Sequence, residues 1–287
     1  MFPHADTAAL RRCRPLFAAV LGLCIFAGCS LFPAINSVKN VELNRLSLPP
    51  IQTPQDSIQL EVVFVDRPAD DPLLGQALWR EIDQISAIPA ETRELLHENG
   101  FQIGHSGSSP PQAVQTLLGM VTDSSASDVV DGKPMIGMRK RLPPGVETEV
   151  QANEPIEKCQ MKIVEGDRAR SCDYEQVRCM FRMKSVRLRD GWIRIDFQPE
   201  IHHGDYRVRT TATEEGWSYQ NRQSVDARHA QQFSLTMNVG EIAIITASSD
   251  HPDSMGEFFF FRDGETGRRQ RLLIVRVADA GKSSSPY

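Results

Sequence analysis

The spacing of hydrophobic residues changes along the chain and predicts two kinds of structure. Ile58 to Val65 is rich in β-branched residues, which is typical of a strand. Apolar residues then recur every three or four positions, which indicates a helix with Leu74, Leu78, Ile82 and Ile85 on its inner face. A second helix from Pro89 to Asn99, a short strand at Phe101 to Ile103 and a third helix after Ser109 follow. Residues 57–120 are therefore predicted to form a small α/β module.

The second half of the chain has a different pattern, with many short apolar runs divided by turn residues. Residues 121–145 are rich in Ser, Gly and Pro and predict a linker or a long loop. In residues 146–278 the expected strands are Lys158–Val164, Tyr174–Leu188, Trp192–Phe197, Arg207–Ala212, Gln231–Met237, Glu241–Ala247, Glu257–Arg262 and Gln270–Ala278. Such spacing is typical of an antiparallel sandwich or meander. The predicted fold class is therefore α+β, a small α/β module followed by a larger antiparallel β-rich domain.

The first residues differ from the rest and indicate export. Arg11, Arg12 and Arg14 precede an apolar run, Leu16–Ala27, of 12 residues. A run of this length is typical of a signal peptide, whereas a membrane-spanning helix needs about 20 apolar residues. The run ends in Phe26-Ala27-Gly28-Cys29, which resembles the lipobox of bacterial lipoproteins. The alternative is a plain secretory signal with Cys29 as an ordinary thiol.

The resemblance to a lipobox implies a location in the cell envelope. It implies that residues 1–28 are removed as a signal peptide and that Cys29 is the site of lipid attachment. Residues 29–56, with four prolines and no sustained period, are expected to act as a tether, and residues 279–287 as a loose tail. Ser30 follows the cysteine, and in enteric bacteria a residue other than aspartate there favours the outer membrane. The expected location is the periplasmic face of the outer membrane.

Three further cysteines raise the question of a disulfide, because an exported protein meets an oxidising compartment. They are Cys159, Cys172 and Cys179. A hairpin that turns at Glu165-Gly166 would place Cys159 opposite Cys172, so this pair is the possible disulfide. A turn at Gly166-Asp167 fits equally well and moves the register by two residues. Both registers remain open from the sequence.

Composition and charge narrow the class of protein. With 40% hydrophobic and 24% charged residues, the chain is neither disordered throughout nor a multi-span membrane protein. A net charge of −5 gives no reason to expect a nucleic-acid partner. The expected partners are the membrane, through the lipid anchor, and either envelope proteins or further copies of the chain. The arginines within residues 182–194 suggest a locally basic sheet face, either simply solvated or suited to an anionic glycan or lipid headgroup.

Motifs that could carry chemistry are weak. Gly104-His105-Ser106-Gly107-Ser108 sits where an α/β-hydrolase has its nucleophile elbow, but serine replaces the final glycine. His202, His203 and Asp205 suggest metal ligation, but adjacent histidines in a strand point to opposite faces. These histidines are therefore expected in exposed turns. The sequence predicts no catalytic residue, no metal site and no cofactor.

Residues 190–278 resemble a known family in the order of their elements. A strand ending in Pro199-Glu200, an amphipathic strand at Gln232–Met237, Asn238-Val239-Gly240-Glu241 and Ser254-Met255-Gly256 follow one another, and Arg271–Val277 closes the series. This order is similar to the terminal β-domain of bacterial secretins, the ring-forming channels of the outer membrane. Thr246-Ala247-Ser248 stands where secretins carry paired glycines. The resemblance implies a related β-fold in an envelope protein.

Together these patterns lead to an expected function. The chain is expected to be a membrane-anchored envelope lipoprotein with a non-enzymatic structural, assembly or binding role. Two alternatives remain, a secretin-like oligomeric component of a secretion or pilus machine and a periplasmic hydrolase that acts on envelope polymers.

Overall fold

A computed structural model describes residues 56–119, 135–213, 216–265 and 267–281. Strands make up 59% of the structure and helices 18%, so the protein is mostly β. It is built from two antiparallel sheets, one of which is a half-barrel. The predicted signal peptide, Cys29 and nearly all of the tether lie outside the described residues. Within the described ranges, no helix is both long enough and apolar enough to cross a bilayer.

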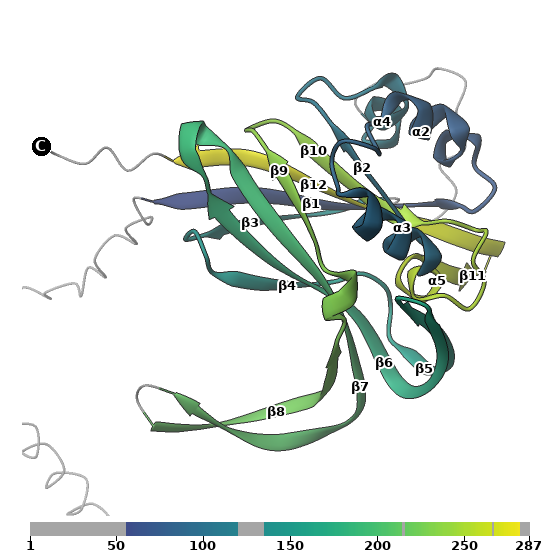
Figure 1. Cartoon of the computed structure of the whole chain (residues 1–287), viewed down its shortest axis with the longest axis vertical. Coiled ribbons are helices and arrows are strands. Elements are labelled where there is room, and N and C mark those ends of the chain that lie inside the picture. The colour runs from purple at the N-terminus through teal and green to yellow at the C-terminus, as the bar shows by residue number, and fades with distance from the viewer. Residues whose placement is uncertain (1–55, 120–134, 214–215, 266, 282–287) are drawn as a thin grey trace, which may run out of the picture. The chain divides into compact units, whose positions relative to one another are not determined.

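The first sheet, called here the covered sheet, has the strand order β2-β10-β12-β1-β3, and β11 pairs with β12. Its strands are β1 (Ser57–Pro68), β2 (Phe101–Ser106), β3 (Met135–Leu142), β10 (Ile242–Ala247), β11 (Phe261–Gly264) and β12 (Gly267–Gly281). Every residue of β10 is buried. One face packs on the second sheet, and the other lies under the helices α2 (Gln76–Glu81) and α4 (Gln112–Leu117), as Figure 1 shows.

The second sheet, called here the open-faced sheet, has the order β4-β6-β7-β8, with β5 paired to β6 and β9 paired to β7. Its strands are β4 (Glu147–Gln151), β5 (Ile156–Glu165), β6 (Arg168–Arg187), β7 (Ile193–Thr213), β8 (Gly216–Ala227) and β9 (Phe233–Met237). In β6 the residues Cys179, Phe181 and Met183 point into the core. The residues between them face away from the covered sheet, and some on this face, such as Met180, are buried as well.

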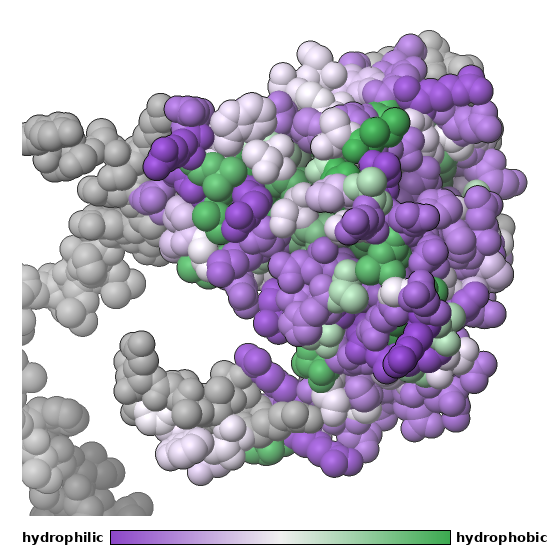
Figure 2. Space-filling view, viewed as in Figure 1, coloured by the Kyte–Doolittle hydropathy of each residue, from purple (hydrophilic) through white to green (hydrophobic). Residues whose placement is uncertain are grey.

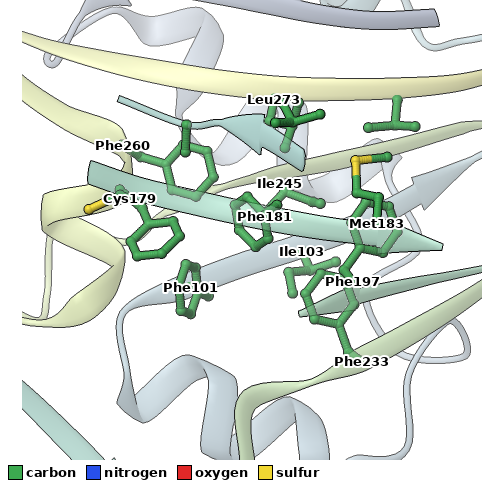
Figure 3. Close-up of a cluster of buried hydrophobic side chains, with 14 of the residues drawn as sticks. Phe101, Ile103, Cys179, Phe181, Met183, Phe197, Phe233, Ile245, Phe260 and Leu273 are labelled. Atoms are coloured by element: carbon green, nitrogen blue, oxygen red, sulfur yellow. The ribbon is translucent and has the colours of Figure 1, made fainter. Parts of the chain in front are cut away.

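The core between the two sheets is dense in aromatic rings. Phe181 of β6 meets Phe101 of β2 at a ring-centroid distance of 6.1 Å, and Phe197 stacks on Phe233 at 4.9 Å. Figure 3 shows Phe181 and Phe197 of the open-faced sheet in one cluster with Ile245 and Leu273 of the covered sheet. Since a buried aromatic side chain contributes a large apolar area, this layer is the main hydrophobic contact between the sheets.

The predicted fold class was wrong. Residues 57–120 do not form an α/β module beside a β domain, because β1 pairs with β12 along its whole length and β2 pairs with β10. The helices here are only six to nine residues long. The pattern misled because the central strands are covered on both faces, and such strands form continuous apolar runs like those of α/β proteins. Ile85, expected on a helix face, is exposed, because α2 ends at Glu81.

Two further elements differ from the predictions. Residues 135–142, expected to be linker, form the edge strand β3. The aromatic run predicted as a strand at 257–262 is largely the helix α5 (Met255–Phe260). Ser254 caps this helix by accepting a hydrogen bond from the Glu257 amide, and Gly256 lets it approach the chain closely, because a Cβ there would lie 2.3 Å from the Gly100 oxygen. Local capping therefore overrides the β-propensity of the phenylalanines.

Candidate functional site

The candidate site is the outward face of the open-faced sheet, where β7 and β8 extend beyond the other strands. The pairing of β7 with β8 is interrupted by a bulge between His203 and Arg207, and β7 bends there. Beyond the bulge, residues 205–213 and 216–222 form a two-stranded arm, which lies at the lower left of Figure 1. Bulges increase twist and redirect the side chains that follow them. The bulge is therefore what separates the arm from the rest of the sheet.

The side chain of Gln223 stabilises the bulge through hydrogen bonds. Its side-chain amide donates to the carbonyl oxygens of Gln176 at 2.7 Å and Gly204 at 2.9 Å, and its Oε1 accepts from Arg178 Nε at 2.7 Å. Gln176 and Gly204 have positive φ angles of 50° and 73°. These are positions where the ladder of backbone hydrogen bonds is disturbed, and a buried amide replaces the lost partners.

Strand alternation shows which side chains share the outward face. Across the sheet, Arg178 pairs with His202 and His202 pairs with Val225. On β8, residues two apart lie on one face, so Tyr219 and Trp217 lie on the same side as Val225. The site therefore joins polar residues of β4, β6 and β7 to aromatic residues of the arm.

The arm exposes unusually large apolar side chains. Val208, Trp217 and Tyr219 are 70%, 71% and 73% exposed, and all three lie on the outward face by the register of β7 and β8. Tyr206 lies beside them, with the Arg178 guanidinium 5.4 Å from its ring centroid. In Figure 2 the arm projects from a surface that is mostly hydrophilic. Such a concentration of apolar surface marks an interaction site more often than a chance exposure does.

A cluster of charged groups lies at the other end of the outward face. Glu149 of β4 and Glu200 and His202 of β7 bring one ligand atom each to within 4.8 Å of one another. Glu200 and His202 are buried although they lie on the face opposite the core. Arg182 Nη2 forms an ion pair with Glu200 Oε1 at 2.8 Å, and His202 Nε2 lies 3.0 Å from Glu200 Oε2.

The predicted site residues have different outcomes. His202 and His203 do point to opposite faces, since His203 packs on the Tyr174 ring at 5.0 Å while His202 joins Glu200. The expectation that these histidines lie in exposed turns was wrong, because both belong to β7 and His202 is buried. No local signal marks His202 as buried. The aromatic alternation Trp217-Ser218-Tyr219 was a signal for the arm that the sequence analysis missed.

Three of the four arginines within 182–194 are paired with carboxylates, so this stretch is not a plain basic face. Arg182 pairs with Glu147 and Glu200, Arg187 with Asp56, and Arg194 with Asp196. Each of these cations is therefore balanced by a carboxylate in its own neighbourhood.

The residues of the elbow-like sequence lie in a strand. Ser106 and His105 end β2, and adjacent strand residues point to opposite faces. Ser106 is buried, and His105 Nε2 lies 3.1 Å from Glu241 Oε2. A nucleophile and its general base must be within hydrogen-bonding reach, and these two neighbours do not have that arrangement.

The cysteines adopt the second of the two registers. Glu165 pairs with Arg168, so the turn is Gly166-Asp167, and Cys159 lies opposite Tyr174 rather than Cys172. The thiols of Cys159, Cys172 and Cys179 are free. Burial raises the pKa of Cys159 to about 11 and raises the pKa of Cys179 well above its ordinary value, which keeps both thiols protonated at neutral pH.

Comparisons with protein-family models, with curated proteins and with solved structures find no match to this chain. The resemblances to a lipobox and to the secretin β-domain therefore stay predictions from the sequence, and the site has to be interpreted from its own geometry.

Proposed function

We propose that the chain is a lipid-anchored envelope protein with a non-enzymatic role, and that it binds another protein of the cell envelope through the arm. The observation that carries this proposal is the exposure of Val208, Trp217 and Tyr219 on one face of a projecting hairpin. Tryptophan and tyrosine are the side chains most enriched among the residues that dominate binding energy at protein interfaces. The backbone pairing of β7 with β8 would hold them on one side of the arm.

The anchor and the arm would have separate tasks. Attachment through Cys29 would hold the protein at the membrane surface, and the arm would select the partner. Confinement near a surface raises the effective concentration of a partner held there, so an interface of modest area would suffice. One acyl chain binds only marginally, so the several chains of a lipoprotein would provide the stable attachment.

The arm is tested by photo-crosslinking in cells that produce the full chain. A photoreactive residue at position 217 is expected to give a discrete adduct, and the variant Tyr219→Ala is expected to reduce its yield several-fold. Position 192 is the matched control, because Trp192 is also exposed but lies in the β6–β7 turn, away from the arm. Absence of an adduct at 217, or an equal adduct at 192, would contradict binding through the arm.

The anchor is tested separately by fractionation. Cys29→Ser is expected to release the protein from the membrane fraction into the soluble periplasm, since the thiol is the predicted acceptor of the acyl chains. A protein that stays in the membrane fraction with Ser at position 29 would contradict the lipid anchor without affecting the test of the arm.

A second candidate is self-association, and the edge strand favours it. Among the described strands, β8 lies at the edge of the open-faced sheet and is 12 residues long. A long unprotected edge offers backbone groups for pairing with another strand, and two copies could pair through the same edge about a two-fold axis. In the crosslinking experiment, an adduct at twice the mass of the chain would favour this candidate over a different envelope protein.

A further inference from the structure

We infer that Glu149, Glu200 and His202 form a binding site for a divalent transition-metal ion, with Zn²⁺ the best match. The site lies on the open-faced sheet but does not involve the aromatic residues of the arm, so it is independent of the proposed partner binding. The sequence predicted no metal site, because Glu149 is far in the chain from Glu200 and His202 and joins them only through the pairing of β4, β6 and β7.

The separations between the ligand atoms suit a single small ion. The three atoms lie within 4.8 Å of one another, and His202 Nε2 and Glu200 Oε2 are 3.0 Å apart. Zinc binds imidazole nitrogen and carboxylate oxygen at about 2.0–2.2 Å, so two of its tetrahedral ligands lie roughly 3.4 Å apart. The pair on β7 is thus already near the required separation, and Glu149 needs only a side-chain rotation to approach.

The site is held in place before any ion arrives. Glu200 and His202 are two residues apart in one strand, so they share a face, and both are buried. Arg182 lies at Glu200 Oε1 as an ion pair, which fixes the carboxylate and leaves Oε2 directed at His202. A partner that orients a ligating carboxylate through its second oxygen is a usual feature of metal sites.

Glu200 Oε1 has no partner with hydrogen-bond geometry, although Arg182 Nη2 is only 2.8 Å away. A completely buried carboxylate with a hydrogen bond to His202 on one oxygen and only a poorly aligned cation at the other is costly to keep charged. Glu149 adds a second negative charge near the same arginine. A divalent cation would offset both carboxylates, and this gives a physical reason for placing Glu200 where no solvent reaches it.

The donor set also limits the type of ion. One imidazole and two carboxylates favour zinc and similar first-row ions over Ca²⁺ or Mg²⁺, which prefer oxygen ligands alone. Glu149 is exposed, so the site opens to solvent on that side. Three protein ligands would leave a fourth position for water.

The test is calorimetric titration of Zn²⁺ into the full chain, purified in mild detergent without a histidine tag and stripped with a chelator. One ion per chain is expected, and His202→Ala and Glu149→Gln are each expected to weaken binding by about 100-fold. Titration with Co²⁺ should give the visible absorption bands of a tetrahedral ion, without the intense near-ultraviolet band that thiolate ligation by the cysteines would produce.

The chain offers two matched controls. His203→Ala removes the neighbouring imidazole on the other face, and Glu147→Gln removes the carboxylate two residues from Glu149 that also contacts Arg182. Both controls are expected to bind Zn²⁺ within twofold of the unmodified chain. If His202→Ala does not fold, His202→Gln, which keeps the size of the side chain, replaces it. Failure of the unmodified chain to bind Zn²⁺, or equal losses in the controls, would overturn the inference.

Discussion

The covered sheet and the open-faced sheet have similar strand pairing but opposite surroundings. The covered sheet has apolar layers on both faces, and its strand β10 is buried at all six positions. The open-faced sheet packs only one face on the covered sheet and extends beyond the core as the arm. A sheet enclosed on both faces can vary little, because any change in volume disturbs a packed layer. The sheet with a free face can carry charged groups and exposed rings, and the candidate sites lie on it.

The two sheets also differ in how completely their buried charged groups are hydrogen-bonded. The covered sheet holds Arg271 and Asp66 in a two-point contact at 2.7 and 2.9 Å, and Arg271 also donates to the Ala152 oxygen at 3.0 Å. The charged groups of this pair therefore all have hydrogen-bond partners: two bonds join β12 to β1, and the third joins β12 to the residue after β4. On the open-faced sheet, Glu200 is buried with a less complete set of partners. The Asp66–Arg271 pair is therefore satisfied within the fold, whereas Glu200 still has an oxygen that lacks a hydrogen-bond partner.

The largest expected effect comes from breaking the charge pair of the covered sheet. Asp66→Ala leaves Arg271 buried without its carboxylate and should lower the free energy of unfolding by about 3–5 kcal/mol. Glu61→Gln is the control, because Glu61 lies in the same strand but pairs with the exposed Arg139 and Arg276, and about 0–1 kcal/mol is expected there. Urea denaturation measures both. Equal losses in the two variants would mean that burial of the pair does not matter.

A smaller effect is expected where the arm begins. Gln223→Ala removes the amide that bonds the carbonyl oxygens of Gln176 and Gly204, so these groups lose partners at the bulge. We expect a loss of about 1–3 kcal/mol in the free energy of unfolding. Hydrogen exchange should also become faster in residues 205–222. Gln160→Ala, at an exposed glutamine that bonds Asp173, should change neither quantity. Unchanged exchange in the arm would show that the bulge holds without Gln223.

The smallest effect concerns alkaline pH and the core face of the open-faced sheet. Burial raises the pKa of Cys159 from 9.0 to about 11. Because the unfolded chain releases this proton first, the contribution to stability is complete below pH 9 and is lost as the pH rises toward 11. The loss from Cys159 is about 1 kcal/mol by pH 10.

The variant Cys159→Ala isolates that contribution. Its free energy of unfolding should fall less between pH 8 and 10 than that of the unmodified chain, by about 1 kcal/mol. Tyr174, whose pKa burial raises to about 12, remains in both proteins. Cys179 also remains, but its raised pKa depends in smaller part on Cys159, so the difference includes this coupling. Parallel pH profiles would show that the Cys159 thiol titrates normally.

The sequence predicted local features better than their assembly. The strand predicted at 192–197 is the first part of the longer β7 (Ile193–Thr213), and the alternation of Ile193, Ile195 and Phe197 toward the core is confirmed. In a half-buried strand every second residue faces the core, so the environment shows in the sequence. Which distant strand a segment pairs with produces no comparable pattern in its own residues. Nothing near Ser57 indicates that it pairs with Gly281, and an apolar run covered on both faces reads the same in an α/β protein.

The candidate sites were harder to predict for the same reason. His202 and Glu200 are two residues apart, but Glu149 joins them only because β4 and β7 both flank β6. The sequence also left the two hairpin turns open, since both glycine-containing pairs are good turn formers. The arm, in contrast, could have been predicted from neighbouring residues, because Trp217 and Tyr219 alternate with polar residues in one strand.

The pairing of β1 with β12 has a consequence for the order of events when the chain is made. β1 is the first of the described elements, yet its neighbour β12 is the last of them, formed by residues 267–281. During synthesis β1 is made long before this neighbour, and contacts so distant in sequence form slowly. We therefore expect assembly to finish only after the last strand is delivered. A chaperone that shields β1 until then would raise the yield of folded protein.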